Sequence, residues 1–476
     1  MSSPAPAPAP AYTPDPRRWR VLVVSLAAGF LVLLDVSIVN VALPSIRTDL
    51  DAGESALQWV VSGYALAFGL LLVPAGRLGD AYGRRPALLG SLAVFTLASV
   101  ACGLAPNAES LVVARLVQGA AGGVLLPQNS GLIQQLFRGA ERGRAFGALG
   151  ATIGISTAIG PLLGGVLIAA IGPEHGWRAV FFVNLPVGIV TLLLAARLVP
   201  PTVRRPGRQD LDPVGVVLLG AGVLCLLLPL IERRTPGTLY AVAAALLVAF
   251  VVWERRHGGR GGVPMVDLAL FRRRSYALGA GVGLLYFAGF TSIFFTYALY
   301  VQEGLHHSAL ASGLAVTPFA VGSAVTSFLG GRMVARAGRP LVAAGLVLVV
   351  VGLVATWVAA TAVPGTGVEW ATALPLLVAG IGSGFVISPN QTLTLAEVPV
   401  ERAGSAGGVL QVGQRIGAAA GIALTGSVFF SAVAATGRDF GLAFRHGLLV
   451  ITAFVLLALL LAGLDIALSR RDEASA

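Results

Sequence analysis

Two charged residues lie inside long apolar segments, where a charge is costly and therefore suggests a chemical role. Asp35 interrupts the apolar run 20–44, and Arg115 lies within the run 111–136. An ionised carboxylate in hydrocarbon costs at least several kcal/mol, so we expect Asp35 to face a wet cavity, pair with a cation or carry a proton. All three states suit a group that takes up and releases protons.

The positions of these two residues along their segments allow them to meet. At a rise of about 1.5 Å per residue, Asp35 lies about 13 Å below the predicted outer end of its helix, and Arg115 about 6 Å below the outer start of its own. We predict that Asp35 takes up and releases a proton. Arg115 would stabilise the charged form of Asp35 in one conformation and withdraw from it in another. Arg115 could instead be structural, and Asp35 could contact a cationic ligand directly.

A third buried charge, Arg415, lies about 16 Å along the predicted helix 404–434. Gln411 and Gln414 precede it in the sequence, which gives a polar cluster near the predicted midplane. Arg415 could balance Asp35, bind an anionic ligand, or satisfy carbonyl groups at a break in the helix.

Aromatic residues recur at helical spacing in the segment 277–302, and Tyr286, Phe290 and Phe294 share one face of it. This face could line a cavity for flat hydrophobic or cationic molecules, or it could be a packing or lipid-facing stripe. Other polar or aromatic residues within apolar segments are candidate ligand contacts or contacts between helices: Asn40, Trp59, Tyr64, Gln118, Asn129, Asn390 and Gln391.

The elements that position these residues are predicted to be membrane-spanning helices. Hydrophobic residues make up 56% of the chain and charged residues 12%, which excludes a soluble fold. Apolar runs of about 20 residues favour helices over a barrel, so the fold class is an all-α integral membrane protein. The fourteen predicted helices cover residues 20–44, 56–79, 87–105, 111–136, 143–170, 178–199, 213–231, 237–254, 277–302, 309–334, 341–361, 371–396, 404–434 and 444–468.

The basic residues indicate the orientation of these helices. Most of the 33 arginines fall in the tails and in the even-numbered gaps, which the positive-inside rule assigns to the cytoplasm. We therefore expect a multi-pass protein of the cell membrane with both termini cytoplasmic. Because the arginines form no continuous basic surface, the formal charge of +11 does not indicate a nucleic-acid partner.

An internal repeat indicates two related halves. Gly76, Arg77, Gly83 and Arg84 recur as Gly331, Arg332, Gly338 and Arg339, each at a separation of 255 residues. Repeated halves are common among secondary transporters. The predicted organisation is a disordered cytoplasmic tail (1–19), a six-helix bundle (20–199), two additional helices with a cytoplasmic linker (200–276), a second six-helix bundle (277–468) and a cytoplasmic tail (469–476).

The gap after the second predicted helix resembles the hallmark loop motif of the major facilitator superfamily. The motif residues are Gly76, Asp80, Gly83, Arg84 and Arg85. The glycines permit a tight turn, the carboxylate can accept from a helix N-terminus, and the arginines can bind carbonyl ends of helices, so the loop could latch one conformation shut. The arginines could alternatively only enforce topology.

Two further stretches resemble particular branches of this superfamily. Gly160-Pro161 and Gly164-Gly165 are similar to a motif of its antiporters, and they would allow close helix packing and a bend, although ordinary packing is the alternative. The stretch 34–44 resembles the first helix of fourteen-helix drug:proton antiporters, with Ser37 where that family often has Thr. The resemblance implies two six-helix bundles with two extra central helices.

The resemblance implies a proton-coupled exporter of hydrophobic or cationic drugs and antibiotics that works by alternating access. The partners would be lipophilic substrate, protons and the bilayer, and we expect a monomer. The chain contains no lysine, so it lacks a Walker loop and would need no cofactor beyond the proton gradient. The alternatives are a facilitator or symporter of a small metabolite, a non-transporting sensor and an intramembrane enzyme, and the scattered histidines argue against the enzyme.

Overall fold

The computed structural model describes residues 15–475 apart from 202–211, 232–235, 261, 263, 366 and 438. Within these residues the chain is helical and has no strand. The α-helices are α1 (Arg18–Asp49), α2 (Glu54–Tyr82), α3 (Arg84–Gly103), α4 (Ala108–Leu136), α5 (Gly139–Ile171), α6 (Pro173–Phe182), α7 (Asn184–Leu198), α8 (Pro213–Ile231), α9 (Thr238–Gly259), α10 (Arg274–Leu299), α11 (Ala309–Ala362), α12 (Val368–Thr394), α13 (Ala403–Ala435) and α14 (Phe440–Ser475). Short helices η1 (Leu268–Arg272), η2 (Tyr300–Gly304) and η3 (Val400–Arg402) join some of them.

Each predicted apolar segment forms a helix, with three differences in its bounds. The segment 178–199 is divided between α6 and α7, which meet at Val183. The segments 309–334 and 341–361 are united in α11, where Gly338 (φ 53°, ψ −139°) marks a kink between two helical parts. The last helix continues to Ser475 instead of ending near 468.

Twelve helices of the described part are long and apolar enough to cross a membrane, where α6 with α7 counts as one and the kinked α11 as one. The helix α8 is a shorter apolar helix. The predicted disordered tail lies mostly outside the described residues.

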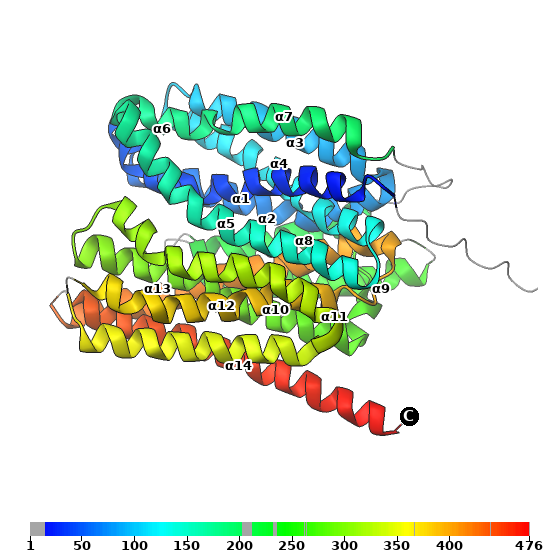
Figure 1. Ribbon diagram of the computed structural model, residues 1–476. Helices are drawn as coiled ribbons and strands as arrows, with labels where there is room; N and C mark the ends of the chain where they lie inside the picture. The colour runs from blue at the N-terminus through cyan, green and yellow to red at the C-terminus, as the bar shows by residue number, and fades with distance from the viewer. Residues whose placement is uncertain are drawn as a thin grey trace, which may run out of the picture.

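The helices form two halves that lie side by side (Figure 1). Helices α1 to α7 pack on one another in the upper half of the view, and α10 to α14 pack on one another in the lower half. Contacts between the halves run mainly through α5 with α11 and α2 with α13. The pair α8 and α9 packs together, and α8 also contacts α2 and α13, so it lies beside this interface.

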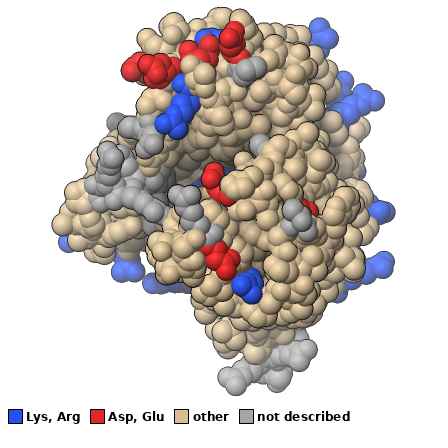
Figure 2. Space-filling model, turned by 90° about the vertical axis from the view of Figure 1, so that its left-hand side faces the viewer, with Lys and Arg blue, Asp and Glu red and all other residues tan. Residues whose placement is uncertain are grey.

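The end of the molecule where α1 begins and α14 ends is called the terminal face below, and the other end the opposite face. Near the terminal face the halves touch through small residues, since a Cβ on Gly76 would lie 2.3 Å from the carbonyl oxygen of Gly404. A Cβ on Gly408 would lie 2.5 Å from the carbonyl oxygen of Leu72. Figure 2 shows the opposite face, which is hollowed between the two halves. The structure is therefore closed at the terminal face and open at the opposite one.

Candidate functional site

Asp35 and Arg115 form a buried ion pair in the interior of the first half. Nη1 of Arg115 in α4 donates to Oδ2 of Asp35 in α1 at 2.5 Å. The exposed fraction is 0% for Asp35 and 1% for Arg115, so water reaches neither group in this conformation. The two residues are 80 positions apart in sequence, and the packing of α1 on α4 brings them together.

Two amide side chains complete the surroundings of the Asp35 carboxylate. Gln118 donates to Oδ1 of Asp35 at 2.9 Å, and Asn184 donates to the same oxygen at 3.0 Å. Both amides also donate to the hydroxyl of Ser99 in α3, at 3.0 and 2.9 Å. These donors and Arg115 replace the hydration that a buried carboxylate loses, and they hold its position.

Arg115 is anchored from three further sides. Its Nε donates to the carbonyl oxygen of Val60 at 3.0 Å, and its Nη1 donates to Gln118 at 2.8 Å. Its guanidinium lies 4.1 Å from the ring centroid of Tyr64, which is a cation–π geometry. A proton on Asp35 would remove the negative charge around which these groups of α1, α2 and α4 are arranged.

A second cluster joins the halves at the terminal face through Asp80. Oδ1 of Asp80 accepts from the backbone N–H of Gly404 at 3.1 Å, and Oδ2 accepts from the backbone N–H of Ser405 at 2.9 Å. These amides belong to the first turn of α13, which has no partner for them within the helix. The carboxylate thus caps α13 from the other half and lies at its positive dipole end.

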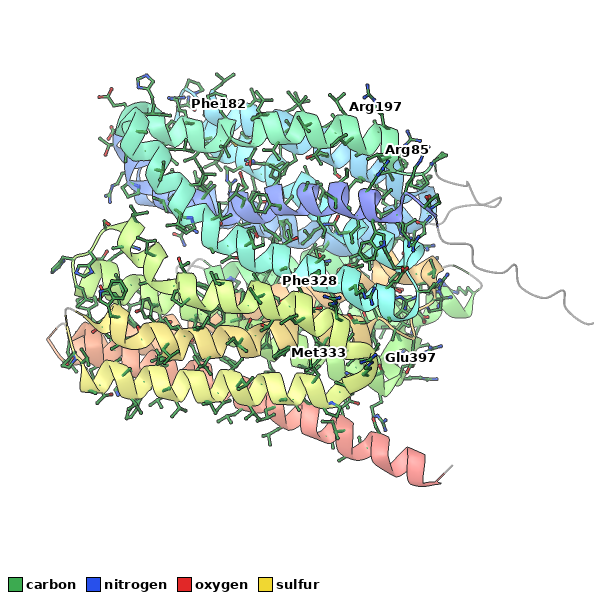
Figure 3. All side chains as sticks on the ribbon, in the orientation of Figure 1. Arg85, Phe182, Arg197, Phe328, Met333 and Glu397 are labelled. Atoms are coloured by element: carbon green, nitrogen blue, oxygen red, sulfur yellow. The ribbon has the colours of Figure 1, made fainter. Side chains whose placement is uncertain are left out.

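Two arginines of the same loop bind carbonyl groups. Arg84 donates to Asp80 at 3.0 Å, to the carbonyl oxygen of Val400 at 2.8 Å and to Gln135 at 2.9 Å. Arg85 donates to the carbonyl oxygen of Ala196 near the end of α7 at 2.6 Å, and Figure 3 places it at the terminal face near Arg197. Gly83, between α2 and α3, has φ 104° and provides the turn. Arg84 therefore spans the interface, whereas Arg85 stays within the first half.

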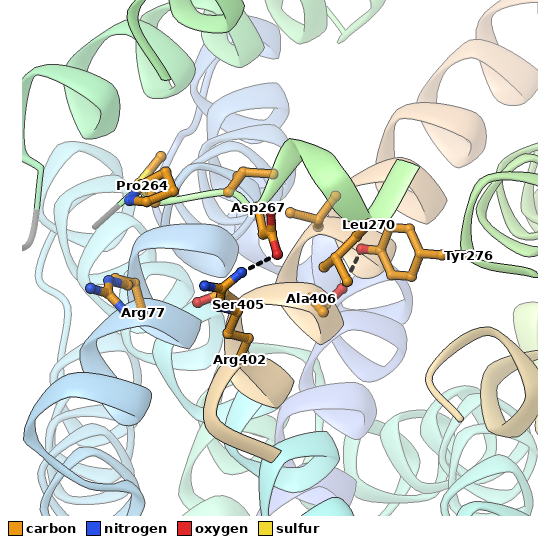
Figure 4. Close-up of a pocket in the computed structure, with 11 residues that line it drawn as sticks. Arg77, Pro264, Asp267, Leu270, Tyr276, Arg402, Ser405 and Ala406 are labelled. Carbon is orange, nitrogen blue, oxygen red and sulfur yellow. Dashed lines mark hydrogen bonds and ion pairs between the residues drawn. The ribbon is translucent and has the colours of Figure 1, made fainter. Parts of the chain in front are cut away.

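The linker before α10 lies against this cluster and forms a small pocket with it (Figure 4). Asp267 pairs with Arg402, and the hydroxyl of Tyr276 donates to the carbonyl oxygen of Ala406 at 2.9 Å. Arg77 and Ser405 line the same pocket. The linker thus adds contacts to the start of α13 on the side where Asp80 caps it.

The glycine-proline stretch of α5 packs against α1 and α11. A Cβ on Gly160 would lie 1.9 Å from the hydroxyl of Ser37, and a Cβ on Gly164 would lie 3.0 Å from Ile38. Pro161 lies next to Gly313 of α11, and Gly165 faces Leu310 of the same helix. This part of α5 therefore joins the Asp35 helix to the second half.

Polar residues of the second half meet Ser130 of α4 at the interface. Gln391 of α12 and Gln411 of α13 donate to its hydroxyl at 3.3 and 3.5 Å. Asn390 instead donates to the carbonyl oxygen of Gly279 at 2.9 Å within the second half. Gln414 lies near Gly283 of α10.

Arg415 lies on α13 but does not approach Asp35 as an ion pair. Its guanidinium lies 4.6 Å from the ring centroid of Phe68 in α2, across the interface between the halves. Of the three roles that the sequence left open, balancing Asp35 is filled by Arg115 in this conformation.

The aromatic face of α10 lies mostly in the packed interior of the second half. Phe290 and Phe294 contact the ring of Phe319 in α11, with centroids 5.8 and 5.3 Å apart, and Tyr286 is buried beside Phe290. This placement is the packing alternative stated above.

The remaining candidates are not gathered at one place. Asn129 accepts from Ser25 inside the first half, and the exposed Asn40 donates to Val36 of its own helix at 3.2 Å. Trp59 packs beside Gly63 on α2. Tyr64 and Gln118, in contrast, both contact the Asp35–Arg115 pair.

The structure adds residues that the sequence had not singled out. Asn184 and Ser99 bind at the Asp35 site, and Gln135, Val400 and Ser405 bind at the Asp80 site. Asn184 and Gln135 carried a signal, because an amide in an apolar helix needs a partner. Val400 contributes only its backbone carbonyl oxygen, so its residue type gives no indication of this contact.

Comparisons with known proteins agree with this architecture. The family model described as "Major Facilitator Superfamily" matches residues 25–422. The chain is 37% identical over 424 residues to a probable actinorhodin transporter of Streptomyces coelicolor, covering 88% of this chain and 73% of that protein. It is 35% identical over 465 residues to a puromycin resistance protein of Streptomyces alboniger, covering 94% and 90%. The solved structure of a proton:xylose symporter has a similar fold, with a TM-score of 0.66 at 17% identity, covering 93% of this chain and 94% of that one.

Proposed function

The chain belongs to the major facilitator superfamily, and on this premise we propose that it exports antibiotic-like small molecules across the cell membrane in exchange for protons. It is a multi-pass membrane transporter and not an enzyme. Relatives that are 32–37% identical carry names such as "Tetracenomycin C resistance and export protein" and "Probable actinorhodin transporter". These names support export as the direction of transport.

The observation that carries proton coupling is the buried Asp35–Arg115 pair. Asp35 has no exposed surface, and its carboxylate is held by Arg115, Gln118 and Asn184. Protonation of Asp35 would leave the Arg115 guanidinium as a buried cation without its counter-ion, which is unfavourable. The arrangement therefore favours a conformational change that gives both groups access to water.

We assign the terminal face to the cytoplasm, because its loops and tails carry most of the arginines. In that orientation both termini are cytoplasmic, and the hollow of Figure 2 opens to the outside. The Asp80 cluster then acts as the latch that closes the cytoplasmic side, and its release would allow the cavity to open inward. The proton gradient is the energy source in this scheme, with no cofactor.

We further propose fourteen membrane crossings. The kink at Gly338 divides α11 into two crossings, and α8 would form a short crossing paired with α9. The chain would then consist of bundles at 20–199 and 277–468, two additional helices and a linker at 200–276, and cytoplasmic tails at 1–19 and 469–476. We expect a single copy to be sufficient for transport.

Transport by purified protein in liposomes tests the proposal. Ethidium and naphthalene-2-sulfonate serve as aromatic probes of opposite charge, and we expect uphill movement of at least one probe when a proton gradient is imposed. Asp35→Asn should abolish uphill movement while probe binding persists. The matched control is Asp439→Asn, because Asp439 is an exposed carboxylate between α13 and α14.

Two results would contradict the proposal. Movement that needs no gradient indicates a facilitator, which is the alternative on the same fold. Gradient-driven export that survives in Asp35→Asn shows that the coupling proton binds elsewhere.

A further inference from the structure

The buried charges of the interior differ in how well they are satisfied. Asp35 has a counter-ion and two amide donors. Arg415 is different: within the described part of the chain, its guanidinium makes no hydrogen bond and no ion pair, and it lies over the ring of Phe68. Five N–H donors are thus held at the interface between the halves without an acceptor.

Arg415 marks the place where the close packing of α2 and α13 ends. Positions 404, 408 and 415 lie on one face of α13, and they meet positions 76, 72 and 68 of α2 in order. The first two contacts on α13 are made by glycines, which let the backbones touch. At the third, an arginine lies over a phenylalanine, and the guanidinium stays partly accessible.

This position is deep in the molecule and between the halves. Arg415 is twelve residues into α13, about 18 Å from its start at the terminal face. The halves are in close contact on its terminal-face side and hollowed at the opposite face, so Arg415 lies where the space between the halves begins. Gly76 and Gly408 lie between Arg415 and the terminal face, and neither leaves room for a side chain.

Within the described residues, neither α2 nor α13 places a negative charge next to Arg415. The helix α13 has no acidic residue, and the two in α2, Glu54 and Asp80, lie at its ends. The ring of Phe68 replaces only part of the hydration that the guanidinium loses at this half-buried position. A cation entering this space would meet a like charge, whereas an anion would meet a preformed partner.

We propose that Arg415 binds an anionic group of the transported molecule, such as a carboxylate, sulfonate or phenolate attached to an aromatic body. This inference rests on the proposed function, and it deepens it by naming the substrate class. The planar guanidinium offers two parallel N–H donors to such a group, and Phe68 holds the guanidinium plane in position. The class differs from the cationic drugs that the sequence suggested.

A stack of side chains joins this site to the Asp35 pair. The rings of Phe68 and Tyr64 are stacked with centroids 6.1 Å apart and an interplanar angle of 15°. Arg415 lies against Phe68, and Arg115 lies against Tyr64. Substrate and proton therefore bind different groups, and the stacked rings of Phe68 and Tyr64 connect the two.

The test compares two probes that share a ring system and differ in the sign of a permanent charge: naphthalene-2-sulfonate and trimethyl(2-naphthyl)ammonium. Equilibrium binding to the purified full chain is measured without a gradient. We expect the wild type to prefer the sulfonate. Arg415→Gln should weaken sulfonate binding by about tenfold or more, and Arg415→Lys should weaken it less, because it keeps the charge but loses the paired donors.

Arg332→Gln is the matched control, because Arg332 also faces a phenylalanine, Phe328, but is exposed at the terminal face. Equal binding of the sulfonate to wild type and Arg415→Gln would overturn the proposal. The proposal would also be overturned if the wild-type protein preferred the ammonium probe or bound neither probe. This second measurement uses the wild type alone, so it does not depend on whether a variant folds. Because binding requires no gradient, a failure here is distinguishable from a failure of proton-driven export.

Discussion

At the scale of residues, Asp35 and Arg115 form a pair whose two members depend on each other. Each is buried, and each would be an uncompensated charge without the other. Removing one member of a buried pair typically costs about 3–5 kcal/mol, while removing both charges together costs much less. Neutralising one group would therefore leave the other as a buried charge without its counter-ion.

A double-mutant cycle checks this dependence. We expect Asp35→Asn and Arg115→Gln each to lower the thermal stability of the purified protein, and the double variant to lose less than the sum of the two. The control cycle uses Arg178 and Asp49, which are joined at 3.1 Å but are about a quarter exposed, so their coupling should be about 1 kcal/mol or less. Additive losses at Asp35 and Arg115 would show that the ion pair is not what stabilises them.

At the scale of elements, the contact of α2 with α13 and that of α5 with α11 join the two halves near the terminal face. The carboxylate of Asp80 caps α13, and the glycines at 76 and 404 allow the cap to be reached. The repeated motif in the second half makes the matching glycine contact, because a Cβ on Gly331 would lie 2.3 Å from the carbonyl oxygen of Gly143 in α5, but it lacks the carboxylate cap. Ala335 stands where Asp80 would align, and Arg339 pairs with Asp465 of α14 in its own half at 2.8 Å. The two copies therefore share a glycine contact between the halves, but only the first copy has a carboxylate that caps a helix of the other half.

Gly76→Val should force this contact apart. A Cβ at position 76 would lie 2.3 Å from the Gly404 carbonyl oxygen and 2.9 Å from the Ser405 nitrogen, and both neighbours are backbone atoms that cannot move aside alone. We expect faster amide hydrogen exchange in the first turns of α13 and a several-fold loss of uphill transport.

Gly413→Val provides the control, because it lies on the same helix and a Cβ there would meet nothing within 4 Å. Unchanged hydrogen exchange in Gly76→Val would refute the role of this contact in closing the terminal face.

At the scale of the whole molecule, the proposed orientation and number of crossings determine which loops face outward. Labelling with a membrane-impermeant maleimide checks them in intact cells, after Cys102 and Cys225 are replaced. We expect Asp439→Cys to react from outside and Arg272→Cys to react only after permeabilisation. Gly237→Cys, between α8 and α9, should react from outside if this pair crosses the membrane. Protection of Gly237→Cys would reduce the number of crossings, and reaction of Arg272→Cys in intact cells would reverse the orientation.

The sequence alone was sufficient to predict the helices and the residues of the terminal-face loop. Apolar runs long enough to cross hydrocarbon have few alternatives to a helix, so the helical segments could be anticipated. The division of 178–199 into α6 and α7 and the union of 309–334 with 341–361 in α11 could not. The loop at 76–85 combines Gly, Asp and Arg within one stretch, so its chemistry can be inferred locally. The sequence could not show whether Gly338 lies in a kink within one helix or in a loop between two helices, because a glycine at positive φ is compatible with both.

Only the tertiary structure decided which side chains meet. The partners of Asp35 come from α4 and α7, and Asn184 is 149 positions away from it. Such contacts depend on how each helix is rotated about its axis, and nearly uniform apolar segments leave that rotation almost unspecified in the sequence. The same reason explains Arg415. Its charge and depth were evident from the sequence, but its position over Phe68, apart from any carboxylate, follows from the packing of α13 on α2.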